Sequence, residues 1–275
     1  MLRQKNLGLI TNRQIVSEEF SHILVSNLPI SHGTFYLGNK GQDYLAPLYL
    51  SGDDGESQES LMFNEGARLN FTDEFLERVS SALHLKRSKA SVPAGLTPED
   101  IFHYAYAVFH SPGYRSRYAE FLKIDFPRLP LTGNLQLFRA LARLGGELTA
   151  LHLLESPQLA QPITEFIGSS KEVTKVSYSN NTVWINASGT KGNTTAGTSG
   201  FQGVREDVWN FHIGGYQVCD KWLKDRKGRT LTKDDLAHYQ KIVIALTETI
   251  RLMAAIDEVI AQHGGWPGAF QTAQT

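Results

Sequence analysis

Several residues in this sequence could do chemistry, but none of them completes a catalytic motif. His103 and His110 lie seven residues apart on a predicted helix and could share one face, yet without a third ligand such a pair favours a structural role. The segment Asp225-Arg226-Lys227 places an acid near a lysine, whereas a metal-dependent nuclease needs a second carboxylate from a neighbouring strand. No P-loop, dinucleotide-binding glycine motif, HExxH zinc motif or GxSxG nucleophile elbow is present. We therefore predict no catalytic residue, no metal ligand and no cofactor.

The tetrapeptide of adenine methylation is absent as well. That chemistry uses Asn or Asp, two prolines and an aromatic ring on which a flipped base can stack. The nearest segment, Asn27-Leu28-Pro29-Ile30, lacks the second proline and the ring. The chain by itself is therefore predicted not to be an enzyme.

A cluster of cations is the strongest candidate for a binding site. Residues 221–229 hold five cations and one acid, a formal charge of +4, interleaved with Trp222; the five cations are Lys221, Lys224, Arg226, Lys227 and Arg229. Such a cluster is suited to phosphate contacts. It equally fits a solvated helix end, where cations interact favourably with the helix dipole. Both interpretations remain open on the sequence.

Two further groups are weaker candidates. Arg115 and Arg117 lie within the segment 114–118 and point to different sides of a helix, so one of them could hold the fold rather than a phosphate. Lys175, Lys191 and Asn193 lie in or beside a predicted hairpin and a Gly/Thr/Ser-rich loop, 189–200. A β-ribbon with such a loop can enter a DNA groove, or it can be an ordinary surface loop.

Composition and charge limit the broad class of the protein. The chain has 275 residues, of which 41% are hydrophobic and 20% are charged, so it can form a sizeable core. Its formal net charge of −1 excludes a globally basic nucleic-acid binder but not a local basic patch. The single cysteine, Cys219, cannot form an intramolecular disulfide, and no signal peptide or membrane-spanning stretch is apparent. These features predict a cytoplasmic protein with no membrane partner.

The alternation of β-rich and helical blocks predicts an α+β fold. We expect one domain, residues 1–275, with a β-rich N-terminal segment (1–66), a helical middle (67–168), a β-hairpin insertion with its loop (169–204) and a helical end (205–275). The hairpin is predicted around Asn180 and Asn181. Thr97, Pro98 and the acids after them predict a helix start.

A long C-terminal helix of about 27 residues, roughly 40 Å, is predicted to begin after Thr232. Its apolar stripe runs from Leu236 to Met253 in steps of three and four. This stripe could pack in the chain's own core against a similar stripe, Leu137 to Leu151, which is the favoured arrangement. Alternatively, it could dock on another subunit, which would make the chain a helical protein-interaction module.

Two long segments resemble the C-terminal target-recognition (specificity) domain of type ISP restriction–modification enzymes and related adenine-specific DNA methyltransferases. They are residues 102–118, with Tyr114-Arg115-x-Arg117-Tyr118, and residues 213–229, with Gly214-Gly215-Tyr216 running into the cation cluster. Shorter segments near Arg13, residues 22–26 and residues 47–50 fit the same family, so the resemblance spans nearly the whole chain.

This resemblance implies a sequence-specific module for double-stranded DNA, without the catalytic domain. A methyltransferase domain or subunit of the same system would be its partner, and this chain begins where that domain would end. The candidate phosphate contacts are Lys221, Lys224, Arg226, Lys227, Arg229, Arg115 and Arg117. The candidate base-reading residues are Lys175, Lys191, Asn193 and Arg13. The methylation chemistry of the family is not implied, because its residues are absent here.

Overall fold

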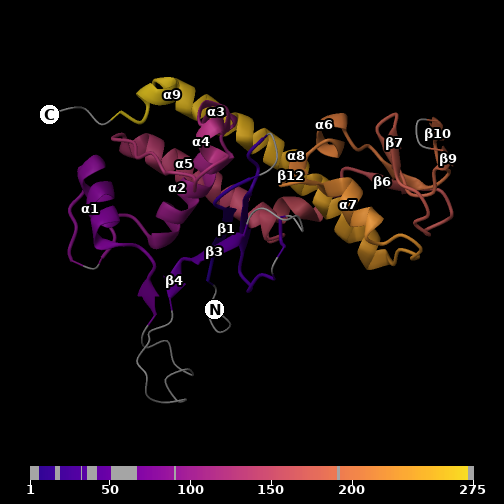
Figure 1. Ribbon diagram of the computed structural model, residues 1–275, viewed down its shortest axis with the longest axis horizontal. Coiled ribbons are helices and arrows are strands. Elements are labelled where there is room, and N and C mark those ends of the chain that lie inside the picture. Colours follow the sequence, from indigo (N-terminus) through magenta and orange to yellow (C-terminus); the bar gives the residue numbers. More distant parts are fainter. Residues whose placement is uncertain are drawn as a thin grey trace, which may run out of the picture. The chain divides into compact units, whose positions relative to one another are not determined.

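A computed structural model describes most of the chain and divides it into two compact units. The described residues are 6–15, 19–31, 33–35, 42–50, 67–89, 91–190 and 193–271. Unit 1 comprises Met1–Thr149 and Leu252–Thr275, and unit 2 comprises Ala150–Arg251. Both units combine helices with small antiparallel sheets, which confirms the predicted α+β class (Figure 1).

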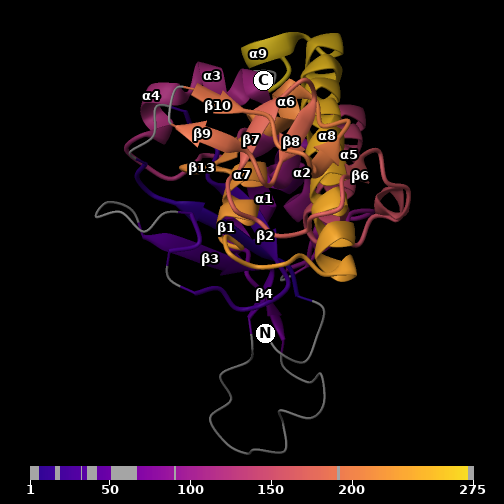
Figure 2. The ribbon, with the colours of Figure 1, turned by 90° about the vertical axis from the view of Figure 1, so that its right-hand side faces the viewer.

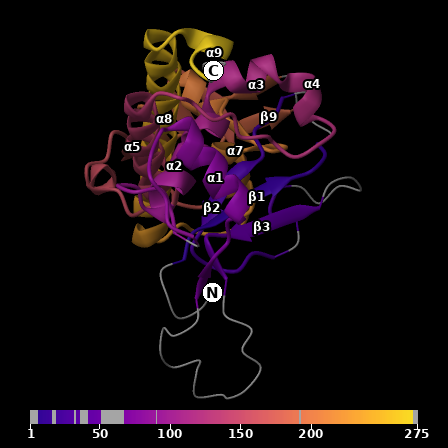
Figure 3. The ribbon, with the colours of Figure 1, turned by 90° about the vertical axis from the view of Figure 1, so that its left-hand side faces the viewer.

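Unit 1 opens with an antiparallel sheet of three strands in the order β2-β1-β3 (Figure 3). Its strands are β1 (Gly8–Asn12), β2 (Ile23–Ser26) and β3 (Asp43–Pro47). Alternate side chains turn inward, so that Ile10, Ile23 and Val25 are buried. The short strands β4 (Tyr49–Leu50) and β5 (Arg68–Leu69) pair with each other. The β-rich N-terminal segment is thus confirmed over its described residues.

The helices of unit 1 begin where local capping predicts. Helix α1 (Asp73–Ala82) is capped by Thr72, and α2 (Pro98–His110) by a capping box between Thr97 and Asp100. The short helices α3 (Pro112–Arg117) and α4 (Ala119–Leu122) follow, then α5 (Leu135–His152) and, near the C-terminus, α9 (Gly265–Gly268).

The predicted apolar stripe of α5 is confirmed. The five leucines of the stripe are at most 4% exposed: Leu137, Leu141, Leu144, Leu148 and Leu151. Gly145 lets α5 approach α2 closely, because a Cβ added there would overlap the carbonyl oxygen of His103.

Unit 2 contains a four-stranded antiparallel sheet in the order β6-β11-β8-β7. Figure 2 labels three of these strands, β6, β7 and β8. Its strands are β6 (Glu165–Ile167), β7 (Ser177–Ser179), β8 (Thr182–Trp184) and β11 (Gly200–Gln202). Asn180 and Asn181 both have positive φ, 50° and 54°, as a tight two-residue hairpin turn requires, so the predicted hairpin is confirmed. A second hairpin pairs β9 (Ser188–Thr190) with β10 (Asn193–Thr195) within the segment predicted to be a loop.

The rest of unit 2 is mainly helical. A 3-10 turn (Pro157–Ala160) precedes the sheet. After the sheet come α6 (Glu206–Trp209), a small ribbon of β12 (His212–Ile213) and β13 (Tyr216–Gln217), α7 (Val218–Lys224) and α8 (Lys233–Gln262). Helix α8 is 30 residues long, close to the predicted length.

The apolar stripe of α8 is covered by unit 2 itself. Tyr239, Val243 and Leu246 join one core with the sheet residues Val183 and Phe201. Leu236 and Ile250 pack against that same core. This stretch of the stripe therefore offers no docking seam, which corrects the protein-interaction alternative, and its observed partner is the sheet core of unit 2.

Candidate nucleic-acid interface

The first two cations of the cluster neutralise carboxylates on their own helix. Lys221 Nζ lies 2.5 and 2.6 Å from the two carboxylate oxygens of Asp225. Lys224 Nζ lies 2.6 Å from Asp220 Oδ2. Both are i,i+4 pairs on and just after α7, a spacing that brings side chains together on a helix surface. Both lysines remain substantially exposed, so a phosphate would have to compete with these carboxylates.

Arg226 is built into the fold. Its guanidinium carbon lies 3.4 Å from the centroid of the Trp222 ring, and its Nη1 donates to the Trp222 carbonyl at 3.1 Å. Its Nε donates to Asp235 Oδ1 at 3.3 Å. The backbone and hydroxyl of Thr232 donate to Asp235, and together with Arg226 they lower the pKa of that carboxyl. Arg226 thus ties the end of α7 to the start of α8.

Trp222 has a structural role too. Its ring stacks on His238 at 5.6 Å and packs at a tilt on Tyr239 at 5.4 Å. With Arg226 also on the ring, Trp222 is an anchor between α7 and α8 rather than an open platform for a base.

Lys227 and Arg229 differ from their neighbours. Both are exposed, and within the described part of the chain neither side chain makes an ion pair or hydrogen bond. Their turn is held by the backbone, since Gly228 N donates to Val173 O at 2.7 Å and Val173 N donates to Arg229 O at 3.0 Å. These two side chains are the best presented cations of the cluster.

The net charge of the cluster is therefore lower than its sequence indicates. The count of +4 for residues 221–229 omits Asp220 and Asp235, which the fold brings onto Lys224 and Arg226. Five cations and three carboxylates leave a charge of +2, and Lys227 and Arg229 carry it.

The hairpin candidates lie on the same unit. Lys175 Nζ donates to Gly189 O at 2.6 Å and to Thr194 Oγ1 at 3.3 Å, so it braces the β9–β10 hairpin. Lys191 lies outside the described residues. Asn193 is the first residue of β10, and its side chain is also outside the description.

Unit 1 separates its two helical arginines as the sequence predicts. Arg115 Nε donates to Phe109 O at 2.8 Å, and burial lowers the pKa of its guanidinium to about 10. Arg117, at the end of α3, is exposed. Arg115 thus holds the fold, while Arg117 is available to a ligand.

Arg13 shares a carboxylate with an arginine that the sequence did not single out. Its Nε lies 3.5 Å from Asp125 Oδ1, and Arg128 Nη2 lies 3.6 Å from Asp125 Oδ2. Arg13 and Arg128 are 61% and 79% exposed. No short-range signal relates Arg13 to the 125–128 segment, whereas the spacing of Asp220 from Lys224 was readable as an i,i+4 pair.

In the described part of the chain, no three His, Cys, Asp or Glu side chains gather in a way that could hold a metal ion. His110, one of the paired histidines, has its Nδ1 2.8 Å from the carbonyl oxygen of Tyr106 within its own helix. None of the helices described is both long and apolar enough to cross a membrane.

Comparison with known proteins gives a family and a set of similar folds. The family model described as Type ISP C-terminal specificity domain matches residues 1–255. No curated protein matches the sequence. Three solved structures share the fold at 18–20% identity over 91–92% of this chain.

The first of these structures is the ATP-dependent Type ISP restriction-modification enzyme LlaBIII bound to DNA, at 18% identity and a TM-score of 0.60. The second is a DrdV–DNA complex, at 20% and 0.63. The third is a nuclease-deletion mutant of the Type ISP enzyme LlaGI with a DNA substrate mimic, at 20% and 0.56. The match covers 16%, 24% and 21% of those chains, so this chain corresponds to less than a quarter of each.

Proposed function

Because the chain belongs to the family of Type ISP C-terminal specificity domains, we propose that it recognises a specific sequence in double-stranded DNA. The observation that carries this proposal is the match to that family across residues 1–255, which includes all of unit 2 and most of unit 1. The three similar structures are DNA complexes of much longer proteins, which supports DNA as the ligand. The two units would act together as one recognition domain.

The cations divide by their surroundings. Lys227 and Arg229 would hold phosphates, since their charges are exposed and their turn is fixed by the backbone. In unit 2, Lys221 and Lys224 would add phosphate contacts, and in unit 1 Arg117 would supply another. Arg226 and Arg115 would each stabilise the fold of their own unit.

The base-reading residues would come from two places. In unit 2 the candidates are Lys175, which braces the β9–β10 hairpin, Asn193, which begins β10, and Lys191, which lies outside the described residues. The hairpin has the form of a β-ribbon able to enter a groove. In unit 1, Arg13 projects from the end of β1 and is more than half exposed.

The chemistry would belong to a partner. We propose that a methyltransferase domain or subunit of the same restriction–modification system methylates adenine, while this chain is a non-catalytic reader that works in the cytoplasm. DNA selected by the reader would be presented to that partner, which flips the base.

The test is selection of the purified chain on a randomised duplex-DNA pool at two salt concentrations. An enriched asymmetric motif would establish sequence-specific recognition. Binding with a steep salt dependence and no motif would leave only phosphate contacts, so that specificity would require the partner domain. No binding at low salt would contradict the proposal.

A further inference from the structure

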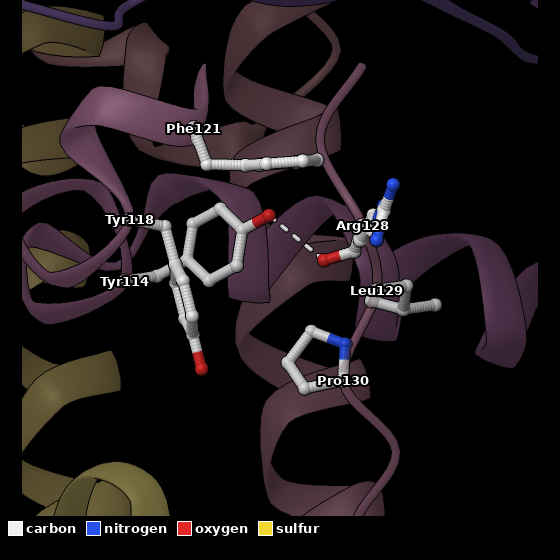
Figure 4. A pocket seen from close by; sticks show the side chains of 6 residues that line it. All are labelled: Tyr114, Tyr118, Phe121, Arg128, Leu129 and Pro130. Atoms are coloured by element: carbon white, nitrogen blue, oxygen red, sulfur yellow. Dashed lines mark hydrogen bonds between the residues drawn. The ribbon is translucent and has the colours of Figure 1, made fainter. Parts of the chain in front are cut away.

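Unit 1 contains an aromatic pocket whose lining includes none of the candidate DNA-contacting residues. Its cavity of about 330 Å³ falls within the size range of small-ligand sites. Figure 4 shows Phe121 and Pro130 on opposite sides of the space, with Tyr118 and Leu129 on the other two. Tyr114 and Arg128 complete the lining.

The walls of this pocket are fixed before any ligand binds. The Tyr114 hydroxyl donates to Arg128 O and the Tyr104 hydroxyl donates to Pro130 O, each at 2.8 Å. Trp266 packs behind Tyr114 and Tyr118, with ring centroids 5.8 and 6.1 Å away. Because the 128–130 segment is held by two buried tyrosines, a ligand would gain contacts at little cost in ordering the protein.

The mouth of the pocket is positively charged. The Arg128 guanidinium carbon lies 4.6 Å from the centroid of the Phe121 ring, and its side chain is 79% exposed. Asp125 is the carboxylate beside it, and Arg13 shares that carboxylate. Two arginines around one carboxylate leave a charge of +1, which favours an anionic group next to the apolar walls.

We propose that this pocket binds one unpaired nucleotide, with its base stacked against Phe121 and Tyr118 and its phosphate on Arg128. Flat aromatic walls accept any base, since every base has a π-face, and arginine at the edge supplies the phosphate contact. The proposal rests on the proposed function, because duplex DNA bound by this chain is the source of the nucleotide. An extended proline-rich peptide would use similar rings but would leave the positive charge without a partner.

The experiment uses the full chain and a duplex with one bulged 2-aminopurine, a base whose fluorescence falls on stacking. Wild-type protein is expected to quench the bulge, and Phe121→Ala to lose the quench and bind the bulge about five- to a hundredfold more weakly. Arg128→Gln should weaken dAMP binding several-fold but leave deoxyadenosine binding unchanged. Phe126→Ala is the matched control, because Phe126 packs edge-on against Tyr44 outside the pocket.

The outcomes separate this proposal from the proposed function. If the chain selects a duplex motif but neither quenches the bulged base nor binds dAMP, the proposed function stands and the proposed nucleotide pocket is overturned. A chain that binds dAMP through Phe121 and Arg128 but binds no duplex supports the pocket alone. Because Arg128→Gln changes an exposed side chain, this variant should stay folded. Its affinity for dAMP therefore tests the pocket even if the Phe121→Ala variant unfolds. Binding of a polyproline peptide in place of dAMP also overturns the proposal.

Discussion

The guanidinium carbon of Arg226 lies 3.4 Å from the centroid of the Trp222 ring, while its Nε donates to Asp235. This one contact explains why a cation in the middle of a basic cluster is not equivalent to its neighbours. The charge of Arg226 interacts with an aromatic ring and a carboxylate of its own chain. The charges of Lys227 and Arg229, on the following turn, are exposed to solvent.

Replacing Arg226 should therefore change stability more than DNA affinity per folded molecule. Arg226→Gln removes the cation–π contact and the ion pair, and we expect a loss of about 1 kcal/mol of unfolding free energy. Urea unfolding measures it, and Arg78→Gln, an exposed arginine paired within its own helix to Glu74, is the control. Equal stability of the two variants would contradict the structural role of Arg226.

The double variant Lys227→Gln/Arg229→Gln should show the opposite behaviour. Its fold should be unchanged, while affinity for all DNA sequences falls together, because phosphate contacts carry no sequence information. The slope of log K against log salt should become shallower by about 2, roughly one for each lost contact. Titrations at several salt concentrations test this.

A broader triple variant, with Lys224, Arg226 and Lys227 replaced together, should also weaken binding uniformly and flatten the salt slope. Unchanged binding by both this variant and the double variant would remove the cluster from the interface.

Local features of this fold were predictable because their causes lie within a few residues. Asn180 and Asn181 tolerate positive φ and so mark a hairpin, and Thr97 marks a helix start because its side chain meets Asp100 three residues on. The regular spacing of the leucines in α5 likewise predicts which face of that helix is buried.

Features that depend on distant pairing were not predictable. The turn at Lys227 is held by Val173, more than fifty residues away, and Arg13 meets Asp125 across more than a hundred. Nor does any periodicity show that the chain returns to unit 1 at Leu252, part-way along α8. The charge of +4 for residues 221–229 exceeds that of the folded cluster for a related reason, because Asp220 and Asp235 lie outside this segment.

The close approach of α2 and α5 makes Gly145 intolerant of even a methyl group. Gly145→Ala should destabilise the protein by about 1–3 kcal/mol, because the new Cβ would overlap the His103 carbonyl oxygen and force the helices apart. Helix propensity alone predicts the reverse, a gain of about 1 kcal/mol for alanine over glycine. Thermal or urea unfolding decides between the two signs. Gly268→Ala is the control, since a Cβ there meets nothing within 4 Å.

Acid should destabilise unit 1 through His22. This side chain is 4% exposed, packs between Phe20 and Phe35, and leaves its Nδ1 without a hydrogen-bond partner among the described residues. Burial, helped by the charge of Arg115 and opposed by Asp43, lowers the pKa of His22 from 6.5 to about 4. Because the folded pKa is the lower one, the unfolded chain takes up the proton first. The contribution of neutral His22 to the free energy of unfolding is fully present above about pH 6.5. It falls by about 3 kcal/mol in all as the pH drops towards 4.

The variant His22→Gln cannot take up this proton, so comparing it with wild type isolates the effect from that of the carboxyl groups. Wild type should be the more stable protein at about pH 7.5, and its advantage should shrink by about 3 kcal/mol as the pH approaches 4. Urea unfolding across this range gives both curves. His212→Gln, which replaces an exposed histidine by the same residue, is the control for the substitution itself. If the His22→Gln curve runs parallel to that of wild type, the buried imidazole does not set the acid sensitivity of the fold.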